Sequence, residues 1–355
     1  IMSNLELLDK ISSVAGISGY EDEVSNIVKS EYQKLNLKYY QDGIGSVVGE
    51  KCADENGPKV MIAAHMDEVG FMIKSIDDQG FIRLQPIGSW WSHMLPGQWF
   101  KVVNRNGEQF YGLMGSRATH GLPQDLRSKT MDISELYLDM GVENKQQLVD
   151  LGIEEGNMVV PMPHFQIMNH TDRVVNKAFD DRVGTYIMIE VAKALENKKH
   201  TPLCLANTVQ EEPGLRGART ATDCVRPDIC FAIDTTLAGD TPLDSNICRL
   251  GDGVVLSMID SNSIAPRKLV AYVEDICKKY DIQHQYAVFN KGGTDSGNIH
   301  KTNAGVINMT LSIPIRYMHT NSSMISMKDV ENCIILLTKL VEEINSEIFD
   351  QVSMK

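Results

Sequence analysis

The sequence predicts a layered α/β fold that is interrupted by a small, inserted all-β domain. In the second half of the chain, apolar runs of strand length alternate with segments of helical periodicity, about 10–15 residues long, which is typical of α/β folds. Between about residues 70 and 164 this alternation stops. Short β-like runs follow one another there, and Asn106-Gly107 is a strong hairpin signal between two of them. We therefore expect an α/β domain formed by residues 2–69 and 165–355, with an all-β insert at 70–164.

The elements of the α/β part can be predicted in chain order from periodicity and from turn residues. Two helices are expected at 4–16 and 19–36, the second opening on acidic residues that suit a helix N-terminus. Strands around turns follow at 39–50 and 58–72. Helices are then expected at 181–197, 216–225, 265–281 and 326–349, and strands at 201–210, 228–234, 283–290 and 304–313. Within the insert, residues 144–152 predict a short helix.

Composition limits the classes of function. The chain has 355 residues, with 43% hydrophobic and 23% charged residues, as in ordinary globular proteins. Its formal net charge of −13 would repel nucleic acid and anionic membranes, so we expect neither as a partner. No apolar run approaches the length of a membrane span, and the start of the chain does not read as a signal peptide.

Cysteine usage indicates the compartment. The seven cysteines are an odd number, contain no Cys-x-x-Cys pair, and several lie in apolar runs. This pattern fits reduced, mostly buried thiols better than a disulfide framework or a zinc–thiolate site. We expect a cytoplasmic protein.

A pair of adjacent glutamates, Glu211 and Glu212, ends the apolar run at 201–210 and precedes the turn residues Pro213-Gly214. Two neighbouring carboxylates repel each other unless positive charge lies between them. They could mark a solvated strand end, since charged residues are mostly exposed. They could also bind a metal ion that supplies the positive charge.

Other acidic and histidine residues occupy comparable places. They are His65 and Asp67 after one strand, Asp180 and Asp181 before a helix, Asp234 at a strand end, and His319 after the last predicted strand. Each has an ordinary structural explanation, such as a helix N-cap or a turn. Because ligands gather at the carboxyl ends of strands in open α/β sheets, the set also fits a site for one or two metal ions. Imidazoles and carboxylates are ligands that zinc, cobalt and manganese accept.

The ordered motifs resemble those of the tetrahedral aminopeptidases, a two-metal family that includes glutamyl and deblocking aminopeptidases. The motifs are AHMDEVGFM, NKAFDDRVG, VQEEPGLRGA, FAID, GGTDSG and RYMHT. The resemblance covers essentially the whole chain, including the inserted β domain. The resemblance implies a three-layer αβα catalytic domain like that of zinc exopeptidases, with a barrel-like β insert. It also implies hydrolysis of the N-terminal residue of short peptides and assembly of twelve subunits into a homo-oligomeric tetrahedral dodecamer, with the insert making subunit contacts.

The same resemblance implies roles for individual residues. His65 and Asp234 would hold one divalent ion, Glu212 and His319 would hold the other, and Asp180 would bridge both. Each subunit would therefore bind two ions, with zinc or cobalt expected and manganese also compatible. Glu211 would be the general base, and Asp67 would orient His65 by hydrogen bonding. In such sites the peptide between Asp180 and Asp181 can be cis.

For several residues the sequence allows either a structural or a functional role. Asp295 in the glycine-rich segment 292–297 could contact the site or the substrate amine, or could cap a tight turn. His120, Trp90 and Trp91 lie in the insert, where they could serve an interface or the insert's own core. The sequence also departs from the family pattern after His319, where HTNSSM replaces the Ser-Pro-x-Glu of many relatives.

Three other functions compete with the aminopeptidase. A two-metal carboxypeptidase or amidohydrolase would not require a free α-amine. A polysaccharide hydrolase also uses paired carboxylates, but it should work with metal removed. A non-enzymatic scaffold would have no need for Glu211. The preferred residue at the substrate's N-terminus is not determined by the sequence.

Overall fold

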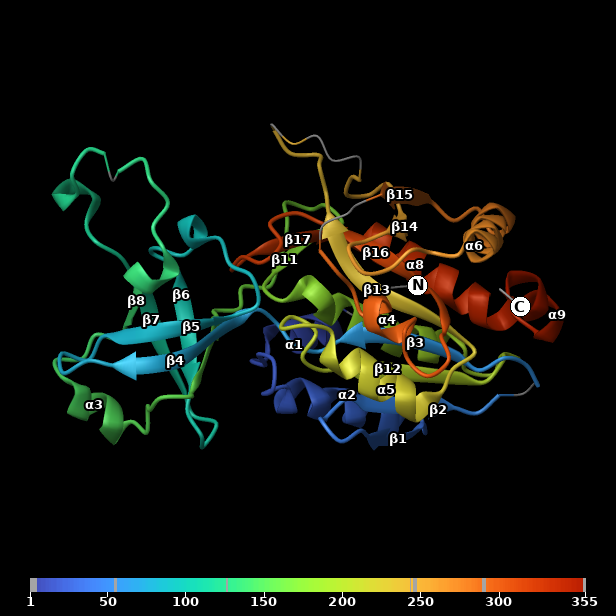
Figure 1. The fold of residues 1–355 in the computed structure, drawn as a ribbon, viewed down its shortest axis with the longest axis horizontal. Helices are drawn as coiled ribbons and strands as arrows, with labels where there is room; N and C mark the ends of the chain where they lie inside the picture. The colour runs from blue at the N-terminus through green and yellow to red at the C-terminus, as the bar shows by residue number, and fades with distance from the viewer. Residues whose placement is uncertain are drawn as a thin grey trace.

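The structure is a computed structural model that describes residues 5–53, 56–125, 127–242, 244, 248–288 and 292–353. It confirms the layered α/β fold with an inserted barrel, and the two parts lie side by side in Figure 1. The ends of the expected α/β domain, residues 2–4 and 354–355, lie outside the described residues. So do the last two residues of the strand predicted at 283–290.

A mixed sheet of eight strands forms the centre of the larger part, in the order β1-β2-β12-β3-β13-β16-β14-β15. Its four inner strands, β12, β3, β13 and β16, are parallel, so their carboxyl ends lie at one edge. The strands are β1 Lys38–Gln41, β2 Val47–Lys51, β3 Val60–His65, β12 Leu203–Thr208, β13 Ile229–Leu237, β14 Val254–Ile259, β15 His284–Val288 and β16 Ile307–Ile315.

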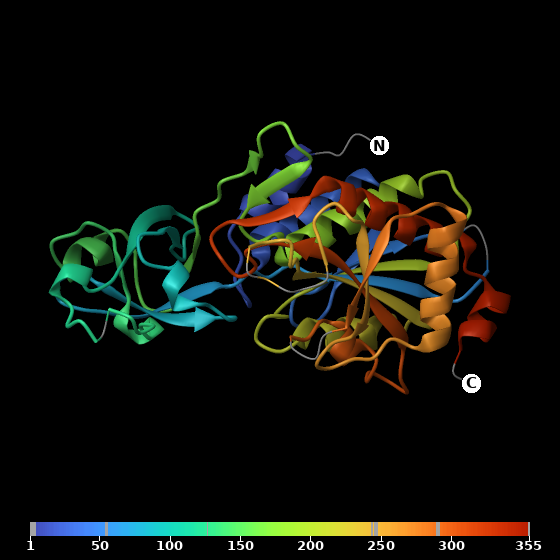
Figure 2. The same ribbon diagram turned by 90° about the horizontal axis from the view of Figure 1, so that it is seen from above.

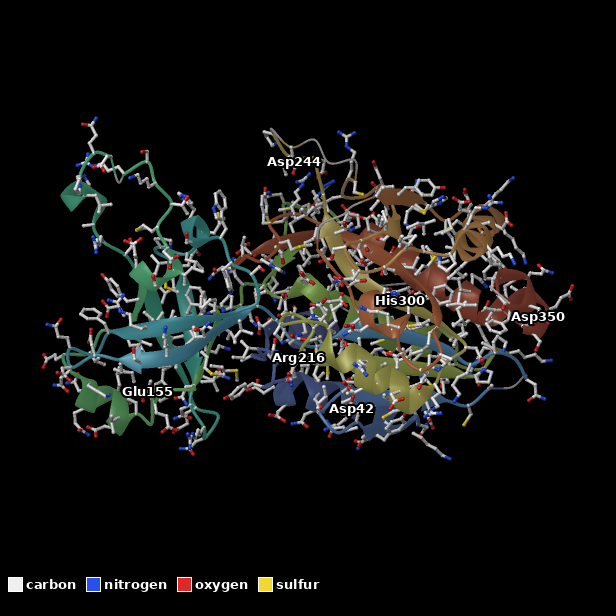
Figure 3. All side chains as sticks on the ribbon, in the orientation of Figure 1. Asp42, Glu155, Arg216, Asp244, His300 and Asp350 are labelled. Carbon is white, nitrogen blue, oxygen red and sulfur yellow. The ribbon has the colours of Figure 1, made fainter. Side chains whose placement is uncertain are left out.

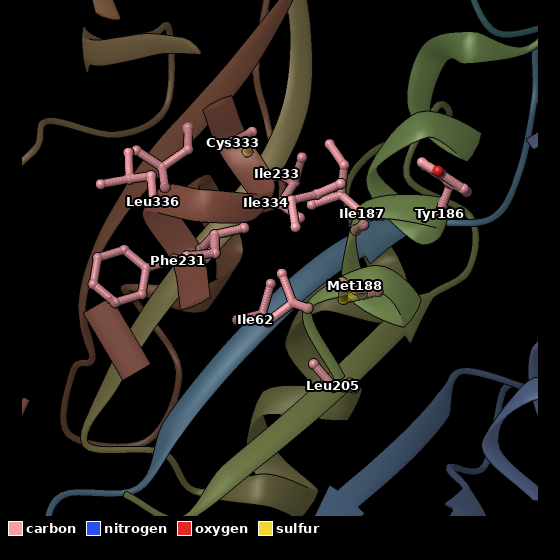
Figure 4. Close-up of a cluster of buried hydrophobic side chains, with 14 of the residues drawn as sticks. Ile62, Tyr186, Ile187, Met188, Leu205, Phe231, Ile233, Cys333, Ile334 and Leu336 are labelled. Atoms are coloured by element: carbon pink, nitrogen blue, oxygen red, sulfur yellow. The ribbon is translucent and has the colours of Figure 1, made fainter. Parts of the chain in front are cut away.

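Helices cover both faces of this sheet and make three layers. The side chains of β3 alternate: Val60, Ile62 and Ala64 join the larger core cluster, while Met61 and Ala63 join a smaller one on the opposite face. The helices are α1 Leu5–Ser13, α2 Asp22–Lys34, α4 Phe179–Ala194, α5 Arg216–Val225, α6 Arg267–Lys279, α7 Ser296–Ile299, α8 Met327–Glu343 and α9 Ser346–Val352. Helices α4 and α8 pack on the larger cluster (Figure 4), and α5 and α7 on the smaller.

The insert is a closed barrel of antiparallel strands in the order β4-β5-β8-β7-β6-β9, seen at the left of Figures 1 and 2. Its core is aromatic: Phe71 stacks on Trp90 with ring centroids 5.0 Å apart, and Phe100 meets Phe71 edge-on. The strands are β4 Gly70–Ile76, β5 Ile82–Ile87, β6 Trp99–Val103, β7 Gln109–Gly115, β8 Tyr137–Asp139 and β9 Met158–Pro161, and helix α3 spans Lys145–Asp150.

A small third sheet, which the sequence analysis did not predict, joins two distant segments. Strands β10 Gln166–Ile167 and β17 Ser323–Ser326 flank β11 Arg173–Asn176. In β11 and β17, Asn176 pairs with Ser323, whose hydroxyl also donates to the Asn176 carbonyl at 2.9 Å. This pairing brings the chain after His319 beside the chain before Asp180.

The single closing helix predicted at 326–349 is wrong, because the structure divides it into α8 and α9. Ile344 has extended backbone angles (φ −66°, ψ 130°), so the first helix cannot continue through it. Asn345 then begins a new helix, since its side chain accepts a hydrogen bond from the Ile348 N–H at 3.0 Å. The apolar periodicity runs through both helices and hides the break.

The acidic surface agrees with the negative net charge of the sequence, and the cysteines are reduced as their pattern predicts. Acidic side chains lie over both parts, for example Glu155 on the barrel and Asp42 and Asp350 on the α/β part (Figure 3). All seven cysteines are free. Among the described residues, no helix combines the length and apolarity that crossing a membrane requires.

Candidate metal centre

The predicted site residues converge at the carboxyl edge of the four parallel strands. His65 is the last residue of β3, and Glu211 and Glu212 follow β12 directly. Asp234 lies within β13, which continues to Leu237 and does not end at Asp234 as the sequence predicts, and His319 follows β16. Because these strands are neighbours in register, their ends deliver side chains from four separate segments to one place.

Asp180 reaches the site from the beginning of α4. The peptide between Asp180 and Asp181 is cis, and both residues have non-helical backbone angles. The two neighbouring carboxylates make different contacts. Asp181 is fully buried beneath the site, where it accepts hydrogen bonds from the backbone N–H groups of His65 (3.3 Å) and Gly184 (3.2 Å).

The side chains form two groups that could each hold a metal ion. In each group one ligand atom per residue lies within 4.8 Å of the others. The first group is His65, Glu211 and Asp234, and the second is Asp180, Glu212 and His319.

Asp180 lies between the two histidines and so connects the groups. Its Oδ1 is 3.3 Å from His65 Nε2, and its Oδ2 is 3.2 Å from His319 Nε2. The second histidine also faces Glu212, with 3.3 Å between His319 Nε2 and Glu212 Oε1. A carboxylate with each oxygen directed to a different imidazole could bridge two ions.

Asp67 positions the site through both its backbone and its side chain. The Nδ1 atom of His65 is 3.0 Å from the backbone carbonyl oxygen of Asp67, but 3.5 Å from its carboxylate. The carbonyl is thus the hydrogen-bond acceptor that orients the ring. The Asp67 carboxylate instead accepts from the backbone N–H groups of Glu211 (2.9 Å) and Glu212 (3.2 Å) and from the Ser18 hydroxyl (2.6 Å).

The electrostatics of the site are dominated by crowded carboxylates. Burial raises the pKa of Glu211 and of Asp234 well above the ordinary range, and neighbouring carboxylates raise both further. For His319, burial alone would lower the pKa, but the Asp180 and Glu212 carboxylates raise it to about 11. The pKa of His65 is likewise raised, by Glu211, Asp180 and Asp67 against the effect of burial. The carboxylates of the site outnumber its two histidines, so negative charge dominates and favours a bound cation.

The residues fit a pair of divalent cations. Within the described part of the chain, no hydrogen bond reaches the buried oxygens Asp180 Oδ1 and Glu212 Oε1, although each lies 3.3 Å from a histidine nitrogen. Buried polar atoms are normally satisfied, so these atoms lack partners that a cation would provide. Mixed imidazole and carboxylate donors are also the chemistry that divalent zinc, cobalt and manganese accept.

The residues whose roles the sequence did not decide lie in different environments in the structure. Asp295 is 2% exposed; one of its oxygens accepts from the Thr208 hydroxyl, and the other has no hydrogen-bond partner among the described residues. Trp90 belongs to the barrel core, where its indole N–H donates to the Gly70 carbonyl at 3.1 Å. Trp91 is 62% exposed, and His120 is exposed on the barrel part.

A cavity of about 490 Å³ adjoins the loop after His319, between the barrel and the α/β part. Its walls include Trp99 and Tyr111 of the barrel, and Asn321 from the loop. The Asn321 side chain donates to the Trp99 carbonyl at 3.2 Å and so fastens this loop to the barrel.

Three charged residues beneath the site, Glu68, Lys177 and Arg182, were not predicted from the sequence. They stand inside the motifs AHMDEVGFM and NKAFDDRVG, next to predicted ligands. Their place inside these motifs, beside predicted ligands, was the available signal. Only the packing shows that all three side chains are buried together.

Comparison with known proteins agrees with the geometry. Residues 45–336 match the model of the M42 glutamyl aminopeptidase family. The chain is 33% identical over 347 residues to the putative aminopeptidase FrvX of Escherichia coli, covering 97% of this chain and 96% of that protein. It is 31% identical over 349 residues to the glutamyl aminopeptidase of Lactococcus lactis, covering 97% and 98%.

Solved structures extend the likeness to the whole fold. A TET aminopeptidase from a marine-sediment thaumarchaeon superposes with a TM-score of 0.95 at 30% identity, covering 98% of both chains. The TET1 peptidase of Pyrococcus horikoshii, which can assemble into a tetrahedron or a large octahedral shell, superposes with a TM-score of 0.86 at 30% identity, covering 96% of this chain and 99% of that one. The chain therefore belongs to the M42 glutamyl aminopeptidase family, and it is a peptidase.

Proposed function

We propose that the chain holds two divalent metal ions and uses them to release the N-terminal residue of short peptides. The observation that carries the proposal is the position of Asp180, whose two oxygens face two different histidines at 3.3 and 3.2 Å. Asp180 would bridge the ions. His65 and Asp234 would hold one ion, and Glu212 and His319 would hold the other.

When bound, two such ions supply Lewis-acid polarisation of the scissile carbonyl and lower the pKa of a water molecule. The donor set suits zinc or cobalt, and manganese is compatible with it. Three ligand carboxylates, Asp180, Glu212 and Asp234, carry a charge of about −3 against +4 for the two ions. The remaining positive charge would keep a neighbouring carboxylate ionised.

Glu211 is the proposed general base. Its Oε2 is 3.8 Å from His65 Nε2, and its backbone N–H is fixed by the Asp67 carboxylate at 2.9 Å. The side chain therefore lies beside His65 and Asp234, the proposed ligands of one ion. It would take the proton from the attacking water and pass it to the leaving amine, a role worth about 10²–10⁴ in rate. Asp67 acts through its neighbours, orienting both His65 and the two glutamates.

We also propose the domain division that the sequence suggests, with residues 2–69 and 165–355 forming the catalytic domain and 70–164 the insert. The barrel would control access to the site and make contacts between subunits of a homo-oligomer, a tetrahedral dodecamer. Support comes from the cavity between the barrel and the His319 loop, and from the tetrahedral assembly of the P. horikoshii TET1 peptidase. The free cysteines support a reducing, cytoplasmic location.

The test is hydrolysis of a panel of short peptides with acidic, basic or apolar first residues, each with a free or an acetylated N-terminus. Each peptide is incubated with chelated protein, and again after zinc or cobalt is added. We expect metal-dependent release of the first residue from unblocked peptides alone. Equal cleavage of the acetylated peptides would favour an amidohydrolase, and full activity of chelated protein would contradict the metal mechanism.

A further inference from the structure

A cluster of buried charges lies directly beneath the candidate metal centre. It consists of Lys177, Glu68 and Arg182, which are 0%, 1% and 0% exposed and are called here the buried ion cluster. Lys177 Nζ lies 2.6 and 2.7 Å from the two oxygens of Glu68, and Arg182 Nη2 lies 3.5 Å from the nearer one. Two cations thus share one carboxylate away from solvent.

The side chains of the cluster join three segments that are far apart in the sequence. Lys177 Nζ donates to the Val14 carbonyl at 2.9 Å, and Glu68 Oε1 accepts from the Gly16 N–H at 3.2 Å. The Arg182 guanidinium donates to the backbone carbonyls of Ile11 (2.7 Å), Gly16 (3.2 Å) and Met66. The segment after α1, the turn after β3 and the beginning of α4 are therefore held together.

The contact between Arg182 and the backbone at residue 16 requires a glycine there. A Cβ atom at position 16 would lie 2.9 Å from Arg182 Nη2, which is closer than ordinary packing permits. The lack of a side chain lets the guanidinium approach the backbone. Burying two cations is costly unless each is paired and hydrogen-bonded, and here both are.

Two of the tied segments carry proposed metal ligands: His65, a ligand of one ion, and Asp180, the proposed bridge between both. The Arg182 guanidinium donates a hydrogen bond to the backbone carbonyl of Met66, the residue that follows His65. Asp180 lies in the chain between Lys177 and Arg182, which both contact Glu68. The buried ion cluster consequently links the backbone of His65 to the backbone of Asp180, although none of its three residues belongs to either ligand group.

We infer that Lys177, Glu68 and Arg182 are positioning residues that set the separation of His65 and Asp180, and with it the spacing of the two ions. The inference rests on the two-ion function proposed above. A cluster that only stabilised the fold would affect unfolding, but not the coordination of the ions. The two roles are separable by spectroscopy.

The experiment titrates cobalt(II) into the metal-free, full-length protein and follows visible absorption, which reports coordination geometry, together with the heat of binding. The variants are Lys177→Met, which removes one cation, and Glu68→Gln, which keeps the side-chain volume and the capacity to accept from Gly16. Leu337→Ala, in the fully buried interior of α8, is the control for lost stability alone.

We expect wild type and Leu337→Ala to bind two cobalt ions with the same spectrum. Both cluster variants should show an altered spectrum and at least about tenfold weaker binding of one ion, and kcat should fall with little change in KM. Wild-type spectra and affinities in folded cluster variants would overturn the inference alone. A wild-type protein that binds fewer than two ions would overturn the proposed function, and this inference with it.

Discussion

Adjacent residues of the same type have different environments in this site. Glu211 and Glu212 are neighbours in the chain, yet Glu212 faces His319, and Glu211 faces His65 from the first group. The Asp67 carboxylate accepts from both of their backbone N–H groups and so fixes the turn that separates them. Asp180 and Asp181 differ in the same way: the Asp180 carboxylate faces the two histidines, and the Asp181 carboxylate is buried beneath the site. Backbone conformation decides which of each pair meets the ligand set.

Substitution Glu211→Gln tests the proposed base. The amide keeps the size of the side chain but cannot accept the proton, so kcat should fall by at least about 10². Cobalt binding should stay at two ions per chain by calorimetry. Loss of one ion in this variant would instead make Glu211 a ligand, as its place beside His65 and Asp234 allows.

Metal binding should release protons. In the metal-free chain the pKa of His319 is raised to about 11, so the ring is protonated at neutral pH, whereas a cation needs the neutral ring. Affinity for cobalt should therefore rise with pH. Calorimetry in two buffers of different ionisation enthalpy should give a net release of at least about one proton per chain, and His319→Ala should release fewer. Equal heats in both buffers would contradict this.

The same raised pKa affects the stability of the metal-free protein in the opposite direction. A histidine whose pKa is higher in the folded state than in the unfolded state stabilises the fold when it is protonated. For His319 this contribution is complete below the ordinary value of 6.5, and it is lost as the pH rises through about 11. Raising the pH therefore weakens the contribution of His319 to the metal-free fold while it favours the metal-bound one.

At the scale of elements, short segments at strand ends and helix ends make the site. Strands β11 and β17 hold the chain before Asp180 against the chain after His319, and the Asn321–Trp99 contact fastens the same loop to the barrel. Helix capping matters in a similar way at the C-terminal end of the chain. There the junction between α8 and α9 depends on Asn345.

Substitution Asn345→Ala should destabilise the protein by about 1 kcal/mol, because it removes the side-chain acceptor of the Ile348 N–H. Chemical denaturation measures the change in the free energy of unfolding. Asn345→Asp is the matched control, since aspartate is an equally good N-cap, and it should keep nearly the full stability. If α8 and α9 instead formed one continuous helix in solution, alanine at 345 would stabilise the protein.

At the scale of the whole molecule, the metal centre lies where distant parts of the α/β fold meet. The ligands come from four strand ends and from α4, and the barrel approaches the same place through the His319 loop. Bound cations would therefore connect segments that span positions 65 to 319. A ligand that binds only the folded state stabilises that state by mass action.

Removing the ions should lower the thermal midpoint of the protein, and adding zinc or cobalt should restore it. At a free metal concentration 100 times the dissociation constant, the stabilisation is about 2.7 kcal/mol. Differential scanning calorimetry measures the shift. In Asp180→Ala the shift should be much smaller, because the proposed bridge is absent. A full shift in that variant, with two ions bound, would rule the bridging role out.

Much of the fold could be predicted because its signals are local. Helical periodicity and an acidic first turn indicated α2, and the alternation of strand-like and helical segments indicated α5 and α6. The Asn106-Gly107 turn with its short flanking runs indicated the β insert. The closing helix failed because the apolar periodicity of α8 continues into α9 across the break at Ile344. The pairing of β11 with β17 could not be predicted, because it joins segments far apart in the chain, such as Asn176 with Ser323.

The sequence by itself determined the α/β class, the insert and the set of residues that meet at the site. These features follow from local periodicity, from turn residues and from the order of the motifs, which can all be read from the sequence. Only the tertiary structure decided how these residues face one another. The direction of each Asp180 oxygen, the acceptor for His65 Nδ1 and the burial of Lys177, Glu68 and Arg182 all depend on contacts between distant segments. Local sequence does not encode such contacts residue by residue, because they follow from how sheet, helices and loops pack in three dimensions.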